Sequence, residues 1–268
     1  MELKREAVSE SIGYLIIFGL ILTGIGLITL YGYPLLMQQQ SSANMRNMEQ
    51  TMIVLQNDLK SLTYQLANYK ETSLRVSGGS LSLYGFSNTY QKFIINTSDG
   101  NINNYVLFPG ELRYFATDEN TFITLENGAV IEKPLAMNGS FMLADPRWYL
   151  DTSSGTLVIN LMNLSTDPSN SQLLSETGVG TVRTRLLRTN MTSATIGSST
   201  TVYITYYPDT RNITPDGYSF AWQNYLTNPN NFNGELSCSG AQPLVCKTSP
   251  GAVQNVIIKE YDVVVETL

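Results

Sequence analysis

The sequence contains no histidine, the side chain that most often serves as a general base and as a metal ligand. It also lacks a Gly-x-Ser-x-Gly nucleophile motif and a phosphate-binding loop. Carboxylates are scattered, so a glycosidase-like pair would have to assemble from distant residues such as Glu111, Asp145 or Asp151. We therefore expect no enzymatic activity, no cofactor and no metal site, with an ectoenzyme as the remote alternative.

Charge is also scarce, since only 14% of the residues are charged, and the formal net charge is −6. No cluster of Lys and Arg follows residue 6. Nucleic-acid binding requires clustered basic side chains to neutralise phosphates, so we expect no nucleic-acid partner. A disordered chain is excluded as well, because 43% of the residues are apolar.

Only two cysteines are present, Cys238 and Cys246, eight positions apart near the C-terminus. Two thiols without histidine or further cysteines are a poor metal site. In a chain that is exported, a pair at this spacing predicts a disulfide. Closing the nine-residue loop would stabilise the fold by about 2.6 kcal/mol.

The longest apolar run lies near the N-terminus. Residues 11 to 45 carry no charge, and Ile12 to Met37 are almost wholly apolar, enough to cross a bilayer. Lys4 and Arg5 precede the run, so the positive-inside bias keeps the N-terminus cytoplasmic and places the rest of the chain outside. A secretory signal peptide is the alternative, but this run is longer than its apolar region and no small-x-small cleavage site follows.

Glycines and one carboxylate distinguish this run from a plain anchor. Small residues let membrane helices approach closely, which favours self-association, although glycine is common in membrane helices generally. Glu10 stands at the mouth of the run, where it is either paired or at the headgroup level near the helix N-terminus. The candidate assembly residues are Glu10, Gly13, Gly19, Gly24 and Gly26.

The segment from Lys4 to Phe18 resembles the class III signal peptide of archaeal type IV pilins and archaellins. Many archaeal pilins read Ala-Val-Ser-Pro-Val-Ile-Gly where residues 7 to 13 read Ala-Val-Ser-Glu-Ser-Ile-Gly. The likeness extends to pilin-like proteins of haloarchaea and methanogens, which follow the span with a Gly-Leu-Ile-x-x-x-Gly ending, here Gly26 to Gly32. Archaellins usually begin differently, and the Ser9-Glu10-Ser11 stretch departs from their pattern.

The resemblance implies that a prepilin peptidase removes a cytoplasmic leader, residues 1–6, by cutting between Glu6 and Ala7. A cut between Arg5 and Glu6 is the alternative, and Glu6 departs from the small residue that usually precedes the cut. It also implies that the retained helix, residues 7–70, polymerises with other copies through residues 7–36. The partners would be copies of the same chain, the pilus assembly machinery and, before assembly, the membrane. The location would be the archaeal cell surface.

After Pro34 the chain becomes amphipathic, and no Pro or Gly interrupts residues 35 to 77. We predict one nearly continuous helix, bent at Pro34, whose stalk over residues 45–69 packs on the chain's own head. A free dimeric coiled coil is the alternative. Apolar side chains at spacings of three and four form the seam: Met45, Met48, Met52, Leu55, Leu59, Leu62, Leu66 and Tyr69.

From Ser73 onward the apolar period changes to two, which predicts short strands in an extracellular head over residues 71–268. Asn127-Gly128, between two alternating runs, predicts a type I′ hairpin, and Gly78-Gly79 is taken as a break between strands. The predicted fold class is α+β, with a long N-terminal helix and a mainly antiparallel, β-sandwich-like head containing one short helix.

That short helix is predicted after Thr214-Pro215-Asp216, which offers an N-cap with proline at the first helical position. Residues 221–226 read Ala-Trp-Gln-Asn-Tyr-Leu, similar to an aromatic helix of the haloarchaeal pilin-like proteins. Its aromatic residues could stack on sugars, but core packing is the favoured interpretation.

Five Asn-x-Ser/Thr triplets are candidate glycosylation sites, although chance alone predicts about four in a segment of this composition. All five lie on the expected outer side, where surface filaments of archaea are commonly glycosylated. They begin at Asn96, Asn138, Asn163, Asn190 and Asn212.

The preferred hypothesis is therefore a structural subunit of an archaeal type IV pilus-like filament, whose head is exposed for adhesion or other surface contacts. The alternative is a membrane-anchored minor pilin or surface adhesin that does not form a homopolymer.

Overall fold

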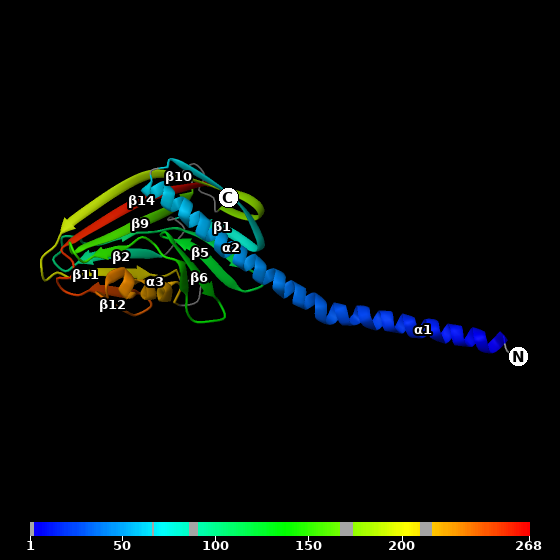
Figure 1. The fold of residues 1–268 in the computed structure, drawn as a ribbon. Helices are drawn as coiled ribbons and strands as arrows, with labels where there is room; N and C mark the ends of the chain where they lie inside the picture. Colours follow the sequence, from blue (N-terminus) through cyan, green and yellow to red (C-terminus); the bar gives the residue numbers. More distant parts are fainter. Residues whose placement is uncertain (1–2, 66, 86–90, 167–173, 210–215) are drawn as a thin grey trace. The chain divides into compact units, whose positions relative to one another are not determined.

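The computed structural model describes residues 3–65, 67–85, 91–166, 174–209 and 216–268, with the backbone alone for 3–11 and 174–175. The chain divides into two compact units, Met1–Asn44 and Met45–Leu268. The first unit is helical throughout its described part, and the second contains the end of the long helix and all the strands of the described residues (Figure 1).

The N-terminal helical region runs through α1 (Leu3–Leu27), the π-helical turn η1 (Ile28–Gly32) and α2 (Tyr33–Tyr64). The distortion expected at Pro34 takes the form of this π turn. Proline lacks an N–H and its ring clashes with the carbonyl four residues earlier. The Tyr33 N–H instead bonds to the Ile28 carbonyl, one residue beyond the usual α-helical partner.

The helix ends earlier than predicted, at Tyr64 instead of residue 70. Leu66 lies outside the described residues, and Tyr69 begins strand β1 (Tyr69–Tyr84). A hydrogen bond joins the end of α2 to the start of β1, where the chain changes direction: Asp58 accepts it from the Thr72 hydroxyl at 2.5 Å. Tertiary contacts thus outweigh the helical spacing of Tyr69.

Nine strands form the larger sheet in the order β7-β6-β5-β4-β1-β10-β14-β9-β8. All neighbours are antiparallel except β14 and β9, which run parallel. Besides β1, its strands are β4 (Glu111–Ala116), β5 (Thr121–Glu126), β6 (Ala129–Pro134), β7 (Phe141–Ala144), β8 (Tyr149–Asp151), β9 (Thr156–Thr166), β10 (Leu174–Thr195) and β14 (Asn255–Thr267).

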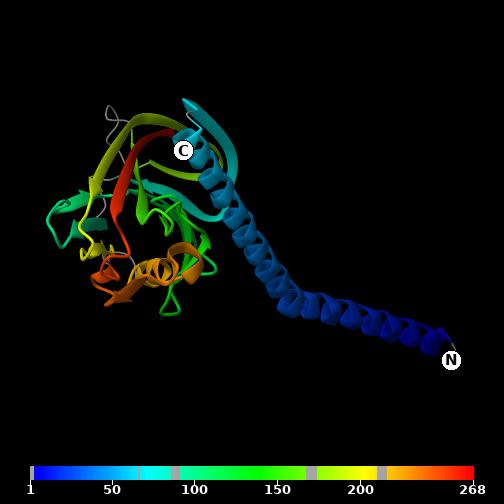
Figure 2. The same ribbon diagram turned by 60° about the vertical axis from the view of Figure 1, so that its left-hand side comes forward.

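Five strands form the smaller sheet in the order β12-β13-β11-β2-β3, all antiparallel. They are β2 (Lys92–Thr97), β3 (Tyr105–Leu107), β11 (Val202–Tyr207), β12 (Leu236–Ser239) and β13 (Leu244–Thr248). Two short helices, α3 (Ser219–Leu226) and α4 (Pro229–Phe232), accompany it (Figure 2).

The larger sheet separates two apolar cores, as strand β4 illustrates. Its Leu112 and Tyr114 belong to the core beneath α2, whereas Phe115 on the opposite face packs against the core shared with the smaller sheet and α3. All six residues of β5 are buried, which is expected for a strand covered on both faces. The head is thus a helix, a sheet and a second sheet in layers, which confirms the predicted α+β class.

Several local predictions can be compared with this architecture. Asn127 and Gly128 have φ values of 49° and 75° between β5 and β6, as a type I′ hairpin requires. Gly78-Gly79, by contrast, lies inside β1, where the pairing register shifts between Val76 and Leu81. The expected break is therefore wrong: the strand continues through an irregularity, stays paired with β10 and pairs with β4 as well from Gly79 onward.

The aromatic helix exists as α3 but begins at Ser219, later than expected. Thr214 and Pro215 of the predicted cap lie outside the described residues. Trp222 is 0% exposed, and its ring centre lies 4.8 Å from that of Phe93. Core packing of the aromatic residues is thereby confirmed. The structure adds a second helix, α4, whose first turn is capped by the Asn228 side chain.

Candidate functional site

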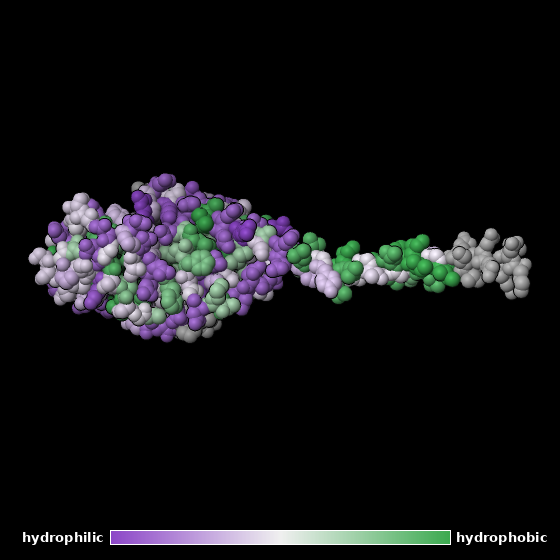
Figure 3. Space-filling model, turned by 60° about the horizontal axis from the view of Figure 1, so that its bottom comes forward, coloured by the Kyte–Doolittle hydropathy of each residue, from purple (hydrophilic) through white to green (hydrophobic). Residues whose placement is uncertain are grey.

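The outstanding feature of the first unit is an apolar helix segment, defined here as Ile12–Met37, whose large side chains are all exposed. Their exposed fractions run from 46% at Met37 to 73% at Tyr31. One helix among the described residues, Ile12–Tyr64, is long and apolar enough to cross a membrane. Figure 3 shows the contrast between this apolar surface and the largely hydrophilic surface of the head.

The glycines of the apolar helix segment leave open space on its surface. A Cβ atom at Gly13, Gly19, Gly24 or Gly26 would meet nothing within 4 Å. At 3.6 residues per turn, residues seven or eleven apart lie within about 20° on a helix. Gly19 and Gly26 therefore share one face, and Gly13 and Gly24 share another, so a partner helix could approach the backbone along either face.

The two threonine hydroxyls of the same segment are satisfied within the helix. The Thr23 hydroxyl donates to the Gly19 carbonyl at 2.8 Å, and the Thr29 hydroxyl donates to the Ile25 carbonyl at 2.9 Å. An apolar surrounding offers no water to unpaired donors, so these bonds suit a helix in lipid or packed among other helices.

The candidate processing and assembly residues Glu6, Ala7 and Glu10 lie within α1. Their side chains lie outside the described part of the structure, so their predicted roles remain predictions.

The second half of the helix has its partners within the chain. Met45, Met48, Met52, Leu55, Leu59 and Leu62 are all buried against the larger sheet. Gln56 strengthens the attachment, because its amide donates to the carbonyls of Gly128 and Asp145 at 2.6 and 3.0 Å. The seam is therefore not available for a free coiled coil, and the preferred interpretation is confirmed.

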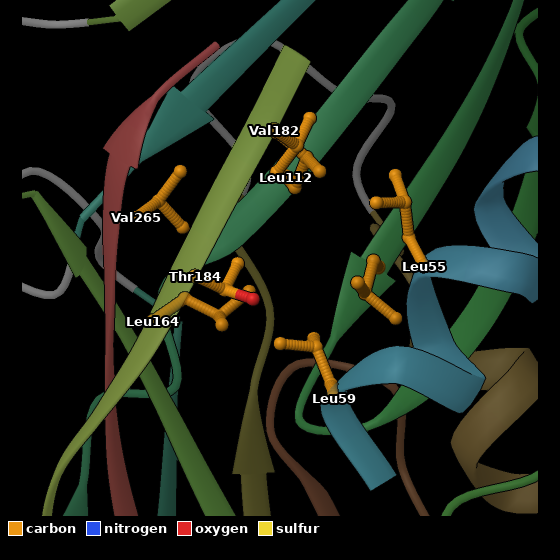
Figure 4. Close-up of a pocket in the computed structure, with 8 residues that line it drawn as sticks. Leu55, Leu59, Leu112, Leu164, Val182, Thr184 and Val265 are labelled. Carbon is orange, nitrogen blue, oxygen red and sulfur yellow. The ribbon is translucent and has the colours of Figure 1, made fainter. Parts of the chain in front are cut away.

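A small apolar cavity lies beneath this half of the helix (Figure 4). Its lining includes Leu55 and Leu59 of α2, Leu112 of β4 and Val265 of β14, and its volume is about 10 Å³. This volume is at the lower limit for one water molecule. The cavity is a packing gap and not a ligand site.

The interior between the two sheets contains a buried polar centre, defined as Glu111, Arg113, Glu126, Tyr206, Tyr218 and Trp222. Glu111 and Glu126 face each other across β4 and β5 and are both 0% exposed. Arg113 forms an ion pair with Glu111 and lies with its guanidinium carbon 4.6 Å from the ring centre of Tyr84. Tyr218 donates to Glu111 at 3.2 Å, and Trp222 donates to Glu126 at 3.0 Å.

Burial raises the pKa of Glu111, and the positive charge of Arg113 opposes that rise. The pKa of Glu126 is raised well above its ordinary value, first by burial and second by the charge of Glu111. Burial and a like charge both disfavour ionisation, so the surroundings of Glu126 favour its protonated form. Both carboxyls are fully buried and bonded to side chains of the head.

Sequence reasoning did not predict this centre, although it named Glu111 as a candidate acid. The sequence did contain a sign of it. Glu111 and Arg113 occupy every second position of β4 together with Phe115, whose side chain faces the core between the two sheets. The other candidate acids lie elsewhere. Asp145 follows β7, and Asp151 accepts hydrogen bonds from the Ser153 and Ser154 hydroxyls at 2.7 Å. Within the described residues, no three His, Cys, Asp or Glu are grouped so as to hold a metal.

The predicted disulfide between Cys238 and Cys246 is present. The two residues are directly opposite each other on β12 and β13, so the bond joins the edge strand of the smaller sheet to its neighbour. Both cysteines are thus bonded to each other within the head.

The candidate glycosylation sites differ in accessibility. Asn138 and Asn190 are exposed, and Asn96 is partly exposed. Asn163 is less accessible because its side-chain oxygen is buried and its amide donates to Asp262 at 3.3 Å. Asn212 lies outside the described residues.

Comparison with known proteins identifies the family of the chain. No curated protein and no solved structure matches the chain. The model of the Family of unknown function (DUF7289) matches residues 6–266, which includes the apolar helix segment and nearly the whole head. The chain therefore belongs to this family of unknown function.

Proposed function

We propose that the chain is a structural subunit of an archaeal type IV pilus-like surface filament, polymerising through its N-terminal helix. The observation that supports this most is the apolar helix segment, whose large side chains are all exposed, followed in the same helix by residues buried against the head. One part of the helix finds its partners within the chain, whereas the other needs partners from outside.

The energetic argument concerns that exposed surface. Burying one large apolar side chain is worth about 1.5–3 kcal/mol, so a segment of this length is not stable in water. Lipid covers it before assembly, and the same segments of other copies cover it in the filament. The faces formed by Gly19 with Gly26 and by Gly13 with Gly24 allow the close backbone approach that such packing needs.

The head is proposed to lie outside the cell. Lys4 and Arg5 before the apolar helix segment favour a cytoplasmic N-terminus, which places residues after the span outside. The disulfide between Cys238 and Cys246 fits an oxidising compartment. Asn138 and Asn190 are the most accessible positions for the proposed glycosylation.

A membrane-anchored surface protein that does not polymerise is the second candidate. The observation in its favour is that Ile12–Met37, at 1.5 Å per residue, is about 39 Å long, enough to span a bilayer without any other copy. In that case the leader would be retained and the glycines would carry no assembly role.

The experiment that separates the two candidates is intact-mass and N-terminal analysis of the chain in purified surface filaments. The proposal expects filaments that contain the chain and start at Ala7, or at Glu6 for the alternative cut. A full-length chain confined to the membrane fraction, with no filaments, would contradict it.

A variant set sharpens this test. Gly19→Leu with Gly26→Leu should abolish filaments while leaving the chain in the membrane, because the added side chains block close packing but not insertion. Ile17→Leu, an apolar exchange in the same segment, is the matched control and should leave filaments intact.

A further inference from the structure

Among the described residues, one face of the smaller sheet packs on the rest of the head and the other face is partly exposed. Side chains alternate along β11, so that Val202, Ile204 and Tyr206 are buried whereas Tyr203 and Tyr207 are partly exposed. Strand β2 alternates in the same way, with Lys92 and Ile94 outward. We call this partly exposed side the tyrosine face and define it by Tyr203, Tyr207, Lys92, Ile94, Val245 and Lys247.

Strand register places these side chains in adjoining rows. Tyr203 lies opposite Lys247 of β13, and Thr205, the next outward residue, lies between Val245 and Ile94. Tyr207 lies opposite Lys92, whose ammonium is 4.8 Å from the centre of the tyrosine ring. The two tyrosines are four residues apart on one strand, which corresponds to about 13 Å.

Charge on the smaller sheet differs in sign from that of the whole chain. Its five strands contain Lys92 and Lys247 but no Asp or Glu, whereas the chain carries a formal net charge of −6. Glu235 precedes β12 and stands at the rim. A partner with complementary charge is therefore anionic.

The remaining groups indicate what kind of anion fits. Tyrosine offers an apolar ring face and a hydroxyl, and Thr205 and Asn96 offer neutral polar groups on the same outward side. Two lysines without a cluster of arginines are too few for nucleic acid, which is held mainly by phosphate contacts. The combination suits sugar rings whose C–H faces rest on tyrosine and whose carboxylates meet lysine.

We infer that the tyrosine face binds an acidic polysaccharide, one whose sugars carry carboxylates. A ligand that contacts both tyrosines is longer than a single sugar. The inference rests on the proposed function only in placing the head outside the cell, and it does not require that the chain polymerise.

The test uses the full chain as a detergent-solubilised monomer, so that its outcome is independent of filament formation. Binding of an oligogalacturonate is measured by calorimetry, with a neutral cello-oligosaccharide and polyglutamate of similar length as comparison ligands. We expect the oligogalacturonate to bind at least tenfold more tightly than either. Polyglutamate controls for charge alone and the cello-oligosaccharide for sugar stacking alone.

Substitutions on the face supply the second measurement. Tyr203→Thr keeps a residue suited to a strand and should weaken binding roughly fivefold, the order expected for one aromatic contact. Lys247→Gln should weaken it about threefold and reduce its salt dependence. Tyr149→Thr, at an exposed tyrosine of the other sheet, is the matched control and should leave binding unchanged.

Equal binding of the three ligands, no binding of the oligogalacturonate, or a loss with Tyr149→Thr equal to that with Tyr203→Thr would each overturn the inference. Concentration-dependent dimers abolished by Tyr203→Thr would show instead that the face joins two copies. Filaments that form from a chain unable to bind the oligogalacturonate would leave the proposed function standing while refuting this one.

Discussion

Residues 12–37 and residues 45–64 belong to the same helical region, yet their side chains meet different surroundings. In the second stretch one stripe of apolar residues is buried in the head, while Val54 on the outer side is 50% exposed. In the first stretch the apolar residues cover the whole circumference, and each large one is exposed. Both stretches are helical, so the spacing of their apolar residues is what distinguishes them. A single apolar stripe can be buried within the same chain, whereas apolar residues on all sides need an external partner.

The comparison also explains why one chain can combine a folded head with an apolar tail. The buried stripe gives the head its covering helix, so the head has a complete core without the apolar helix segment. In the proposed filament, that segment changes its surroundings from lipid to other copies without altering the head. The predictions that follow test this independence, from the largest expected effect to the smallest.

The largest effect is expected in the docked half. Leu62→Ala removes a side chain that is 0% exposed and should lower the free energy of unfolding of the head by about 2–5 kcal/mol. Leu22→Ala, at a position 52% exposed in the apolar half, should leave head unfolding unchanged. Urea denaturation of the full chain in detergent measures both, and equal losses would contradict the independence of the two halves.

A charge placed in the apolar half of the helix should impair membrane insertion, whereas a charge on the outer side of the docked half should not. Ile21→Arg places a guanidinium near the middle of the span and should disfavour membrane insertion by about 2.5–3.5 kcal/mol. Val54→Arg, also at an exposed apolar position, should change neither insertion nor head stability by more than about 0.5 kcal/mol. The membrane-bound fraction after alkaline extraction reports insertion, and retention of the Ile21→Arg chain would refute the assignment of this segment.

Removal of the disulfide should affect the head alone. Replacing Cys238 and Cys246 by serine opens a nine-residue loop and should cost the head about 2.6 kcal/mol. Insertion of the apolar helix segment should not change. A loss of insertion in this double variant, measured by the same extraction, would show that the two regions are coupled.

The smallest effect concerns pH at the contact between α2 and β6. The pKa of Glu132 is raised from 4.5 to about 7, first by partial burial and second by the charge of Glu49 on α2. The folded state therefore holds this proton more tightly than the unfolded state, so its contribution to stability is complete below about pH 4.5 and falls as the pH rises to 7.

Glu132→Gln removes this ionisable group, so the variant should gain stability over the wild type at pH 8 compared with pH 4.5. The gain in the free energy of unfolding should be less than about 1 kcal/mol, because solvent screens a partly exposed group. Unfolding curves at the two pH values give the difference. Glu49→Gln should reproduce part of it, and an equal change at both pH values would argue against this origin.

Short-range patterns in the sequence predicted much of the fold. The spacing of Met45 to Leu62 identified the docked face of the helix, and Asn127-Gly128 identified the hairpin between β5 and β6. Long-range pairing was not accessible in the same way. Gly78-Gly79 resembled a turn, because glycine in a turn and glycine at an irregularity within a paired strand look alike until the partner strands are known.

The candidate sites likewise divide into one that depends on neighbouring residues in the sequence and others that depend on long-range packing. The apolar helix segment could be identified from the sequence because its residues are contiguous. The buried polar centre could not, because Glu126 and Trp222 meet only in the packed head, and charged residues in strands usually face solvent. The tyrosine face depends on Ile94, Tyr203 and Lys247, which only the register of three distant strands brings together.

The most direct test of the central claim is an image of the native filament at side-chain detail. Our account predicts residues 12–37 of each subunit packed against the same residues of neighbouring copies, with close approach at Gly19 and Gly26, and the head on the outside. Filaments that lack this chain, or in which Ile12–Met37 contacts no other copy, would contradict it.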